Sequence, residues 1–225
     1  MLILALDTSG RYGSVALCRG DANNFEVLGF SNLEGGTYSA RMIPVIADLL
    51  QAANLTPTDL EAFSVVDGPG SFTGLRVGLS TVKALCEVLR RPLAVVSMLE
   101  ALGITYGGEG STVATLLDAG RSEVYAGEYD ISSRGASPGR QFIVKLGELA
   151  GQISLNSRII TTSAKAVETL RAAGMHVEQV EPVHADTIAR IGLRKLLAGE
   201  TADPATLDAN YIRRSDAELF SLPKP

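Results

Sequence analysis

Asp7, Thr8 and Ser9 form the first segment whose side chains could take part in chemistry. They follow a short apolar run at the N-terminus. A carboxylate beside two hydroxyl groups at the end of a strand is suited to hold hydrated magnesium. The same aspartate would serve equally well to accept hydrogen bonds from the backbone of a turn, so both roles stay open.

A glycine-rich loop is the second such segment, and it lies between an apolar run at 62–66 and a helical pattern that begins at Leu75. The loop and the helix start comprise Asp67, Gly68, Pro69, Gly70, Ser71, Phe72, Thr73, Gly74, Leu75, Arg76, Val77 and Gly78. Thr73 is placed to cap the helix, whose first N–H groups could then bind an anion. The alternative is a tight turn that packs a helix against a sheet. The loop matches neither the Walker-type phosphate loop nor the dinucleotide-binding fingerprint.

Histidines and serines give little support to a metal site or a hydrolase. The only two histidines, His176 and His184, lie eight residues apart and do not form a zinc-binding pair at helical spacing. We therefore expect no metal site. Ser71 has no histidine near it in the sequence, which disfavours a catalytic triad.

Composition limits the classes of partner. The chain has 225 residues, 46% of them hydrophobic, which suits one or two compact domains. Its net charge is −5 and it has no run of lysines and arginines, so we do not expect it to bind RNA tightly alone. The arginine pairs 90–91 and 213–214 could form small basic patches, although solvated surface explains them as well.

Two further features concern the cellular compartment. Cys18 and Cys86 lie in apolar segments and are expected to be buried thiols rather than a disulfide. The apolar run at residues 1–6 is too short for a membrane span and is expected to be a core strand. We expect a cytoplasmic protein without a membrane contact.

Strand and helix patterns alternate along the chain. Strands are expected at 2–7, 14–18, 25–30, 62–66, 93–96, 112–117, 123–131, 141–144, 158–162 and 176–180, with a short one at 210–213. Helices are expected at 38–53, 57–61, 75–90, 97–105, 146–153, 164–173 and 186–198. This order predicts an α/β fold with a mixed sheet in each half. The glycine-rich stretch 107–110 predicts lobes at 1–106 and 107–225, with a tail that can pack back on the first lobe.

The helices at 38–53 and 75–90 are apolar on more than one side. The residues that we expect at a partner interface are Met42, Val45, Leu49, Val77, Thr81, Val82 and Leu85. A helix that is apolar all round is usually buried, so an outward apolar side would mark an interface. The alternative is that the second lobe of the same chain covers these helices.

The segment from Gly68 to Gly78 resembles the hallmark of the bacterial TsaB (YeaZ) family. The similarity continues at 4–9 and 14–17, at 118–121 with 123–125, and at 211–213. The first half matches closely, whereas 130–205 match only in general shape. In this family a histidine usually stands before the Ser-x-Arg of the first long helix, and here that position is Tyr38.

The resemblance implies an actin-like, sugar-kinase-like (ASKHA) fold with two related lobes. It also implies a non-catalytic subunit that stabilises and activates the catalytic subunit TsaD in threonylcarbamoylation of the tRNA adenosine next to the anticodon. The implied partners are TsaD, the ATPase subunit TsaE and, for the chain alone, a second copy that pairs through the same two helices. tRNA would be met only through the complex, and no membrane is involved.

A nucleotide role stays open in this interpretation. The resemblance places Asp7, Thr8 and Ser9 where related ATPases contact phosphate, and it allows ATP or ADP with magnesium at a subunit interface. A stand-alone ATPase or small-molecule kinase of the same fold is the alternative function. A glycoprotease-like peptidase receives less support, because it needs a metal or an activated nucleophile.

Overall fold

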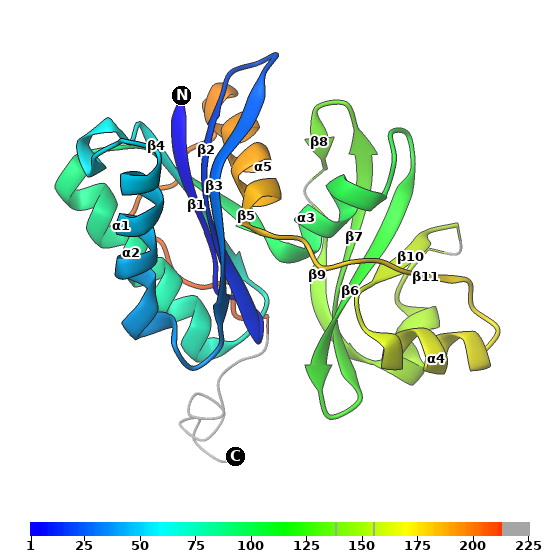
Figure 1. Ribbon diagram of the computed structural model, residues 1–225. Coiled ribbons are helices and arrows are strands. Elements are labelled where there is room, and N and C mark those ends of the chain that lie inside the picture. Colours follow the sequence, from blue (N-terminus) through cyan, green and yellow to red (C-terminus); the bar gives the residue numbers. More distant parts are fainter. Residues whose placement is uncertain (138, 155, 213–225) are drawn as a thin grey trace. The chain divides into compact units, whose positions relative to one another are not determined.

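The structure is a computed structural model that describes residues 1–137, 139–154 and 156–212 (Figure 1). Contacts divide the chain into two compact units. The N-terminal unit contains 1–101 and 182–209, and the C-terminal unit contains 102–181 and the described residues from 210 on. The lobes expected from the sequence were 1–106 and 107–225, so the two divisions differ in the placement of 102–106 and of 182–209.

The N-terminal unit is built on a five-stranded mixed sheet in the order β3-β2-β1-β4-β5. Its strands are β1 (Leu2–Asp7), β2 (Tyr12–Gly20), β3 (Phe25–Glu34), β4 (Ala62–Gly68) and β5 (Leu93–Ser97). β1, β2 and β3 are antiparallel, whereas β1, β4 and β5 run parallel. All six residues of β1 are buried, as expected of a central strand that helices cover on both faces.

Three helices cover this sheet. α1 (Tyr38–Ala52) and α2 (Phe72–Leu89) lie on one face, and α5 (Ala185–Leu197) lies on the other (Figure 1). Two buried hydrogen bonds fix α5: Ala185 N–H donates to Ser14 Oγ at 2.9 Å, and Ser64 Oγ donates to Ile188 O at 3.2 Å. The chain after α5 then pairs Ala202 with Leu93 at the β5 edge.

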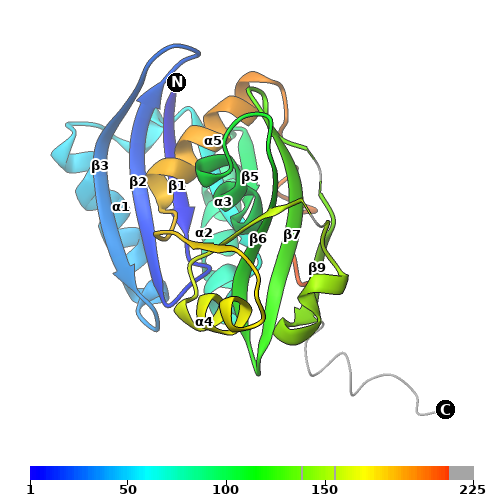
Figure 2. The same cartoon turned by 90° about the vertical axis from the view of Figure 1, so that its right-hand side faces the viewer.

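The C-terminal unit has a second mixed sheet in the order β11-β10-β6-β7-β8, with β9 paired to β7. Its strands are β6 (Thr112–Gly120), β7 (Glu123–Ser132), β8 (Gly135–Ala136), β9 (Gln141–Lys145), β10 (Arg158–Thr161) and β11 (Val177–Gln179). Figure 2 shows β6, β7 and β9 side by side. The helices are α3 (Met98–Tyr106), which begins in the N-terminal unit, and α4 (Ala164–Ala172), which packs on β10 and β11.

The expected α/β class with two mixed sheets is confirmed, and the main differences concern element ends. α2 begins at Phe72 and is capped by Ser71, so the expected start at Leu75 with Thr73 as cap is wrong. The segments expected as helices after Thr56 and Lys145 are 3-10 turns, η1 (Pro57–Asp59) and η2 (Leu146–Gly151).

Three smaller expectations also have an outcome. Residues 210–212 form no strand, and Arg213 and Arg214 lie outside the described residues. Cys18 and Cys86 are buried free thiols, as expected. Among the helices of the described residues, none combines the length and apolar character needed to cross a membrane.

Candidate functional site at the glycine loop and helices α1 and α2

The turn after β1 is buried and held together by its own side chains. Asp7, Thr8 and Ser9 are each less than a tenth exposed. Asp7 Oδ1 accepts hydrogen bonds from Ser9 N–H at 2.8 Å and from Ser9 Oγ at 2.7 Å. Burial raises the pKa of the Asp7 carboxyl, while the Ser9 hydrogen bonds and His184 oppose that rise. The geometry thus fits the turn-stabilising role of Asp7.

The glycine loop packs directly on this turn. Ser71 N–H donates to Ser9 O at 2.6 Å. A Cβ atom at Gly70 would meet Ser9 O, and one at Gly74 would meet Thr8 O. One at Gly78, a helical turn further on, would meet Thr8 Oγ1. The glycines therefore allow α2 to approach the end of β1 more closely than any other residue would permit.

Ser71 uses its side chain to begin α2. Its Oγ accepts a hydrogen bond from Gly74 N–H at 3.2 Å, which satisfies one of the free donors of the first turn. One turn later, the Arg76 guanidinium lies 3.7 Å from the centre of the Phe72 ring. The loop thus supplies a cap and an exposed aromatic–arginine pair at the helix start.

Asp67 introduces a buried charge at the base of the loop. The β4–β5 register is irregular between Val66 and Gly68, and Asp67 is the extra residue. Within the described residues, the buried atoms Asp67 Oδ1 and Thr8 Oγ1 have no hydrogen-bond partner. Burial raises the pKa of Asp67 to about 6, with a smaller lowering by Lys195. Lys195 itself forms an ion pair with Glu100 at 2.7 Å.

A pocket of about 440 Å³ opens where α1 and α2 begin. It is lined by Gly10, Arg11, Gly35, Gly36, Tyr38, Ser39, Ser71, Thr73, Gly74 and Val77. Tyr38 Oη donates to Gly10 O at 2.8 Å, so the tyrosine closes the pocket against the β1–β2 turn. Burial raises the pKa of Tyr38 to about 12, and the nearby Asp7 adds to the rise. Sequence reasoning noticed Tyr38 but not this contact.

The seven residues expected at a partner interface divide by burial. Met42, Val45 and Val82 are at most 4% exposed, so they belong to the core of this chain and not to an outward face. Leu49, Val77, Thr81 and Leu85 are partly buried. The most exposed large apolar side chains of the two helices are Ile43 on α1, 56% exposed, and Val88 on α2, 78% exposed, while Phe72 at the start of α2 is 39% exposed. The interface itself stays a prediction, and these two residues are the ones that sequence reasoning missed.

Metal-binding residues do not converge in the described part of the chain. No group of three His, Cys, Asp or Glu side chains there is placed to hold a metal ion. His184 stands at the N-terminal end of α5, where its ring meets the edge of Phe30 with 6.0 Å between centres. His176 is exposed just before β11.

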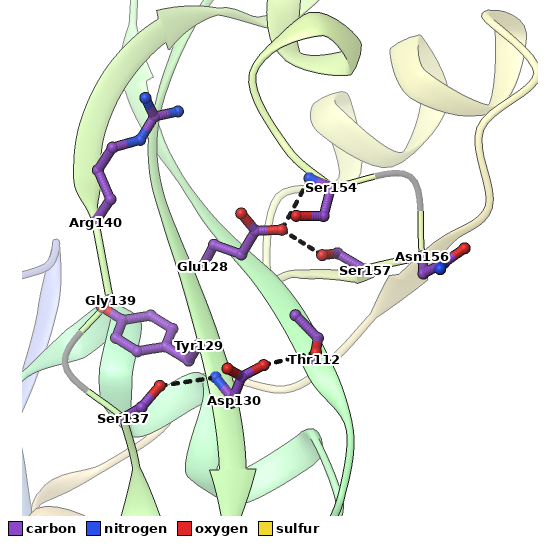
Figure 3. Close-up of a pocket in the computed structure, with 10 residues that line it drawn as sticks. All are labelled: Thr112, Glu128, Tyr129, Asp130, Ser137, Gly139, Arg140, Ser154, Asn156 and Ser157. Carbon is purple, nitrogen blue, oxygen red and sulfur yellow. Dashed lines mark hydrogen bonds between the residues drawn. The ribbon is translucent and has the colours of Figure 1, made fainter.

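A second pocket, of about 430 Å³, lies in the C-terminal unit (Figure 3). Two of its lining residues, Ser137 and Gly139, belong to a Gly-x-Ser-x-Gly spacing that begins at Gly135 and that the sequence analysis overlooked. The spacing follows β7 in a hairpin, not the strand–turn–helix context of a hydrolase. Asp130 N–H donates to Ser137 Oγ, and Glu128 accepts hydrogen bonds from Ser154 and Ser157. These polar groups therefore hold the surrounding loops.

Comparison with known proteins gives consistent results. The family model described as TsaD, tRNA N6-adenosine threonylcarbamoyltransferase, matches residues 35–168, more than half of the chain. The tRNA threonylcarbamoyladenosine biosynthesis protein TsaB of Bacillus subtilis is 35% identical over 57% of this chain and 55% of its own length. The TsaB protein of Escherichia coli is 32% identical over 63% of this chain and 60% of its own length. The chain therefore spans somewhat more than half the length of these curated relatives.

Solved structures agree on the fold. YeaZ from Pseudomonas aeruginosa superposes with a TM-score of 0.75 at 24% identity, covering 93% of this chain and all of that one. Together with the two mixed sheets and their covering helices, this similarity identifies the fold as the actin-like, sugar-kinase-like (ASKHA) fold.

Proposed function

The chain belongs to the TsaB/YeaZ family, and we propose that it acts in tRNA threonylcarbamoyladenosine biosynthesis. The match of the chain to the TsaD family model supports the same pathway. Its role there is that of a non-catalytic subunit. It binds the catalytic subunit TsaD and stabilises its active form. The observation that carries this proposal is the match over residues 35–168, which includes α1, α2 and the glycine loop.

The non-catalytic part of the proposal rests on how the candidate reactive groups are used. Asp7 is bonded to its own turn, and Ser71 caps α2. Tyr38 stands at the start of α1 and bonds to Gly10 O. Each of these groups is engaged in holding α1 or α2 in place, which supports a binding role for the helices over a reaction at the turn.

The partner-binding surface is assigned to the outward sides of α1 and α2. Among the large aliphatic side chains of the described residues, Val88 and Ile43 are the two most exposed. An outward apolar surface on these helices would mark an interaction site. The same surface pairs with a second copy when the chain is alone, so the homodimer and the TsaD complex exclude each other. TsaE joins the assembly as a further partner, and tRNA is met only through the complex.

Size-exclusion chromatography with light scattering tests the proposal, on the chain alone and mixed with TsaD from the same source. The expected result is a homodimer that converts to a heteromer when TsaD is added. If the chain does not bind TsaD at protein concentrations well above the Kd values typical of specific complexes, the proposed role is wrong. ATP turnover by the purified chain would instead favour the stand-alone ATPase.

A further inference from the structure

The β6–β7 hairpin ends in a turn with an unusual backbone. Gly120 pairs with Glu123, so Arg121 and Ser122 form a two-residue connection. Both have positive φ, 54° and 61°, and Gly120 before them has φ of 74°. Two-residue hairpin turns with this geometry strongly favour Asn-Gly, Asp-Gly or Gly-Gly. An arginine followed by a serine therefore has an unfavourable backbone conformational energy in this turn.

The turn is fixed from both sides, so this strain cannot relax. Asp118 Oδ1 accepts a hydrogen bond from Gly120 N–H at 2.8 Å. Leu146 N–H, at the start of η2, donates to Ser122 O at 3.0 Å. The register is also irregular between Asp118 and Gly120, which leaves an extra residue in β6 and redirects the strand end.

The Arg121 side chain is exposed at the tip of this rigid hairpin. It takes part in none of the ion pairs found within the described residues. The nearest charged residues along the hairpin, Asp118 and Glu123, are both acidic, and the chain as a whole has a net charge of −5. A nucleic-acid backbone needs several cations at once, and this chain has no run of lysines and arginines, whereas a single carboxylate needs only one local pair with the guanidinium. Lys145 on β9 stands opposite Glu123, so the acidic charge beside the turn is partly offset.

We infer that Arg121 is a contact residue for a carboxylate of a protein partner, and that the strained turn is retained to present it. Backbone strain held at an exposed residue is a reason to infer a functional position. This inference rests on the proposed function in one respect, since it takes TsaD as the partner. It adds a contact in the C-terminal unit to the surface assigned to α1 and α2.

The test compares two variants that relieve the same strain. Arg121→Gly and Ser122→Gly both remove a left-handed non-glycine residue, so both should raise Tm. Only Arg121→Gly should weaken binding to TsaD, by about tenfold or more in Kd, whereas Ser122→Gly binds like the wild-type chain. Titration calorimetry gives both constants, and thermal melts give Tm.

The outcomes separate the two proposals. Wild-type chain that does not bind TsaD would refute the proposed function and, with it, the partner assigned to Arg121. Wild-type binding together with an unchanged Kd for Arg121→Gly would refute the Arg121 contact alone. If Tm rises in neither variant, the turn is not strained, and the observation from which the contact was inferred no longer supports it.

Discussion

Asp67 couples the folding of this chain to pH. One oxygen of its carboxyl is buried at the base of the glycine loop and has no hydrogen-bond partner among the described residues. Burial raises the pKa of this carboxyl from 3.8 to about 6. The folded chain therefore holds this proton more tightly than the unfolded chain does. The resulting contribution to stability is present at low pH and is lost as the pH rises from about 4 to about 6, by up to about 3 kcal/mol.

Replacing Asp67 with asparagine removes this penalty. Asp67→Asn should raise the free energy of unfolding by about 1 to 3 kcal/mol near pH 7.5 and have a much smaller effect near pH 4.5. Urea unfolding at the two pH values measures the difference. Asp48→Asn is the matched control, because Asp48 is exposed on α1. An equal gain at both pH values would mean that burial of the Asp67 charge is not the cause.

Ser71 offers a test of its role as a cap. Ser71→Ala should lower the free energy of unfolding by about 1 kcal/mol, because Gly74 N–H loses its acceptor. Ser71→Asp should keep most of the stability, since its carboxylate accepts from the same N–H group and suits a helix N-terminus. Thermal melts compare the two variants, and equal losses would contradict the capping role.

At the scale of the element, the question is what seats α2 against β1. Gly78→Ala would bring a methyl group against Thr8 Oγ1 and should cost about 1 to 3 kcal/mol, partly offset by the better helix propensity of alanine. Adding Thr8→Ala removes the obstructing hydroxyl, which has no partner in the described chain. The double variant should regain most of the loss in a double-mutant cycle measured by urea unfolding.

Gly74→Ala is the control for this cycle. Its new methyl group would meet the backbone oxygen of Thr8, which no side-chain substitution can remove. Thr8→Ala should therefore fail to rescue Gly74→Ala. Equal rescue at both glycines would show that the contact with Thr8 does not set the position of α2.

Much of α2 and its loop could be predicted from the sequence. The apolar run of β4, the glycines and the helical periodicity are local signals, and they placed a strand, a loop and a helix correctly. The cap was misplaced from Ser71 to Thr73, because both residues are acceptable caps and only the backbone conformation decides. The reason for the glycines was also hidden, since it lies in contacts with Thr8 and Ser9, which are distant in the sequence.

At the scale of the whole molecule, the sequence indicated two halves but not the path between them. The helix pattern near 186–198 is local, whereas its packing on the first sheet depends on Ser14 and Ser64, far away in the chain. The glycine-rich stretch at 107–110 indicated a boundary between the two halves. Pro182 marks a break in the chain, but a local break does not show that the residues after it belong to the first unit. Assignment of residues to units needs long-range contacts that periodicity does not encode.

The faces of α1 and α2 show the same limit. Both helices are apolar on more than one side, so the sequence alone could not separate Val82, which is fully buried, from Val88, which is 78% exposed. The exposed fractions in the structure separate these two valines directly. They remove the core residues Met42, Val45 and Val82 from the predicted interface and add Ile43 and Val88 to the partly buried residues that remain in it.

This assignment makes a direct prediction about assembly. Val88→Glu and Ile43→Glu should each leave the free energy of unfolding within about 0.5 kcal/mol of the wild-type value, because both side chains are largely in water. Each should nevertheless disrupt the homodimer and the TsaD complex, because a carboxylate would be buried without a partner at the interface. Light scattering after size exclusion measures both assemblies.

Val27→Glu is the matched control, since Val27 is 44% exposed and belongs to β3 rather than to either helix. It should assemble like the wild-type chain. If Val88→Glu and Ile43→Glu assemble normally while Val27→Glu does not, the binding surface lies along the edge of β3. The outward sides of α1 and α2 would then remain exposed to solvent in the assembly. If all three variants assemble normally, the outward sides of α1 and α2 contribute little to binding, and the contact inferred for Arg121 becomes the first surface to examine.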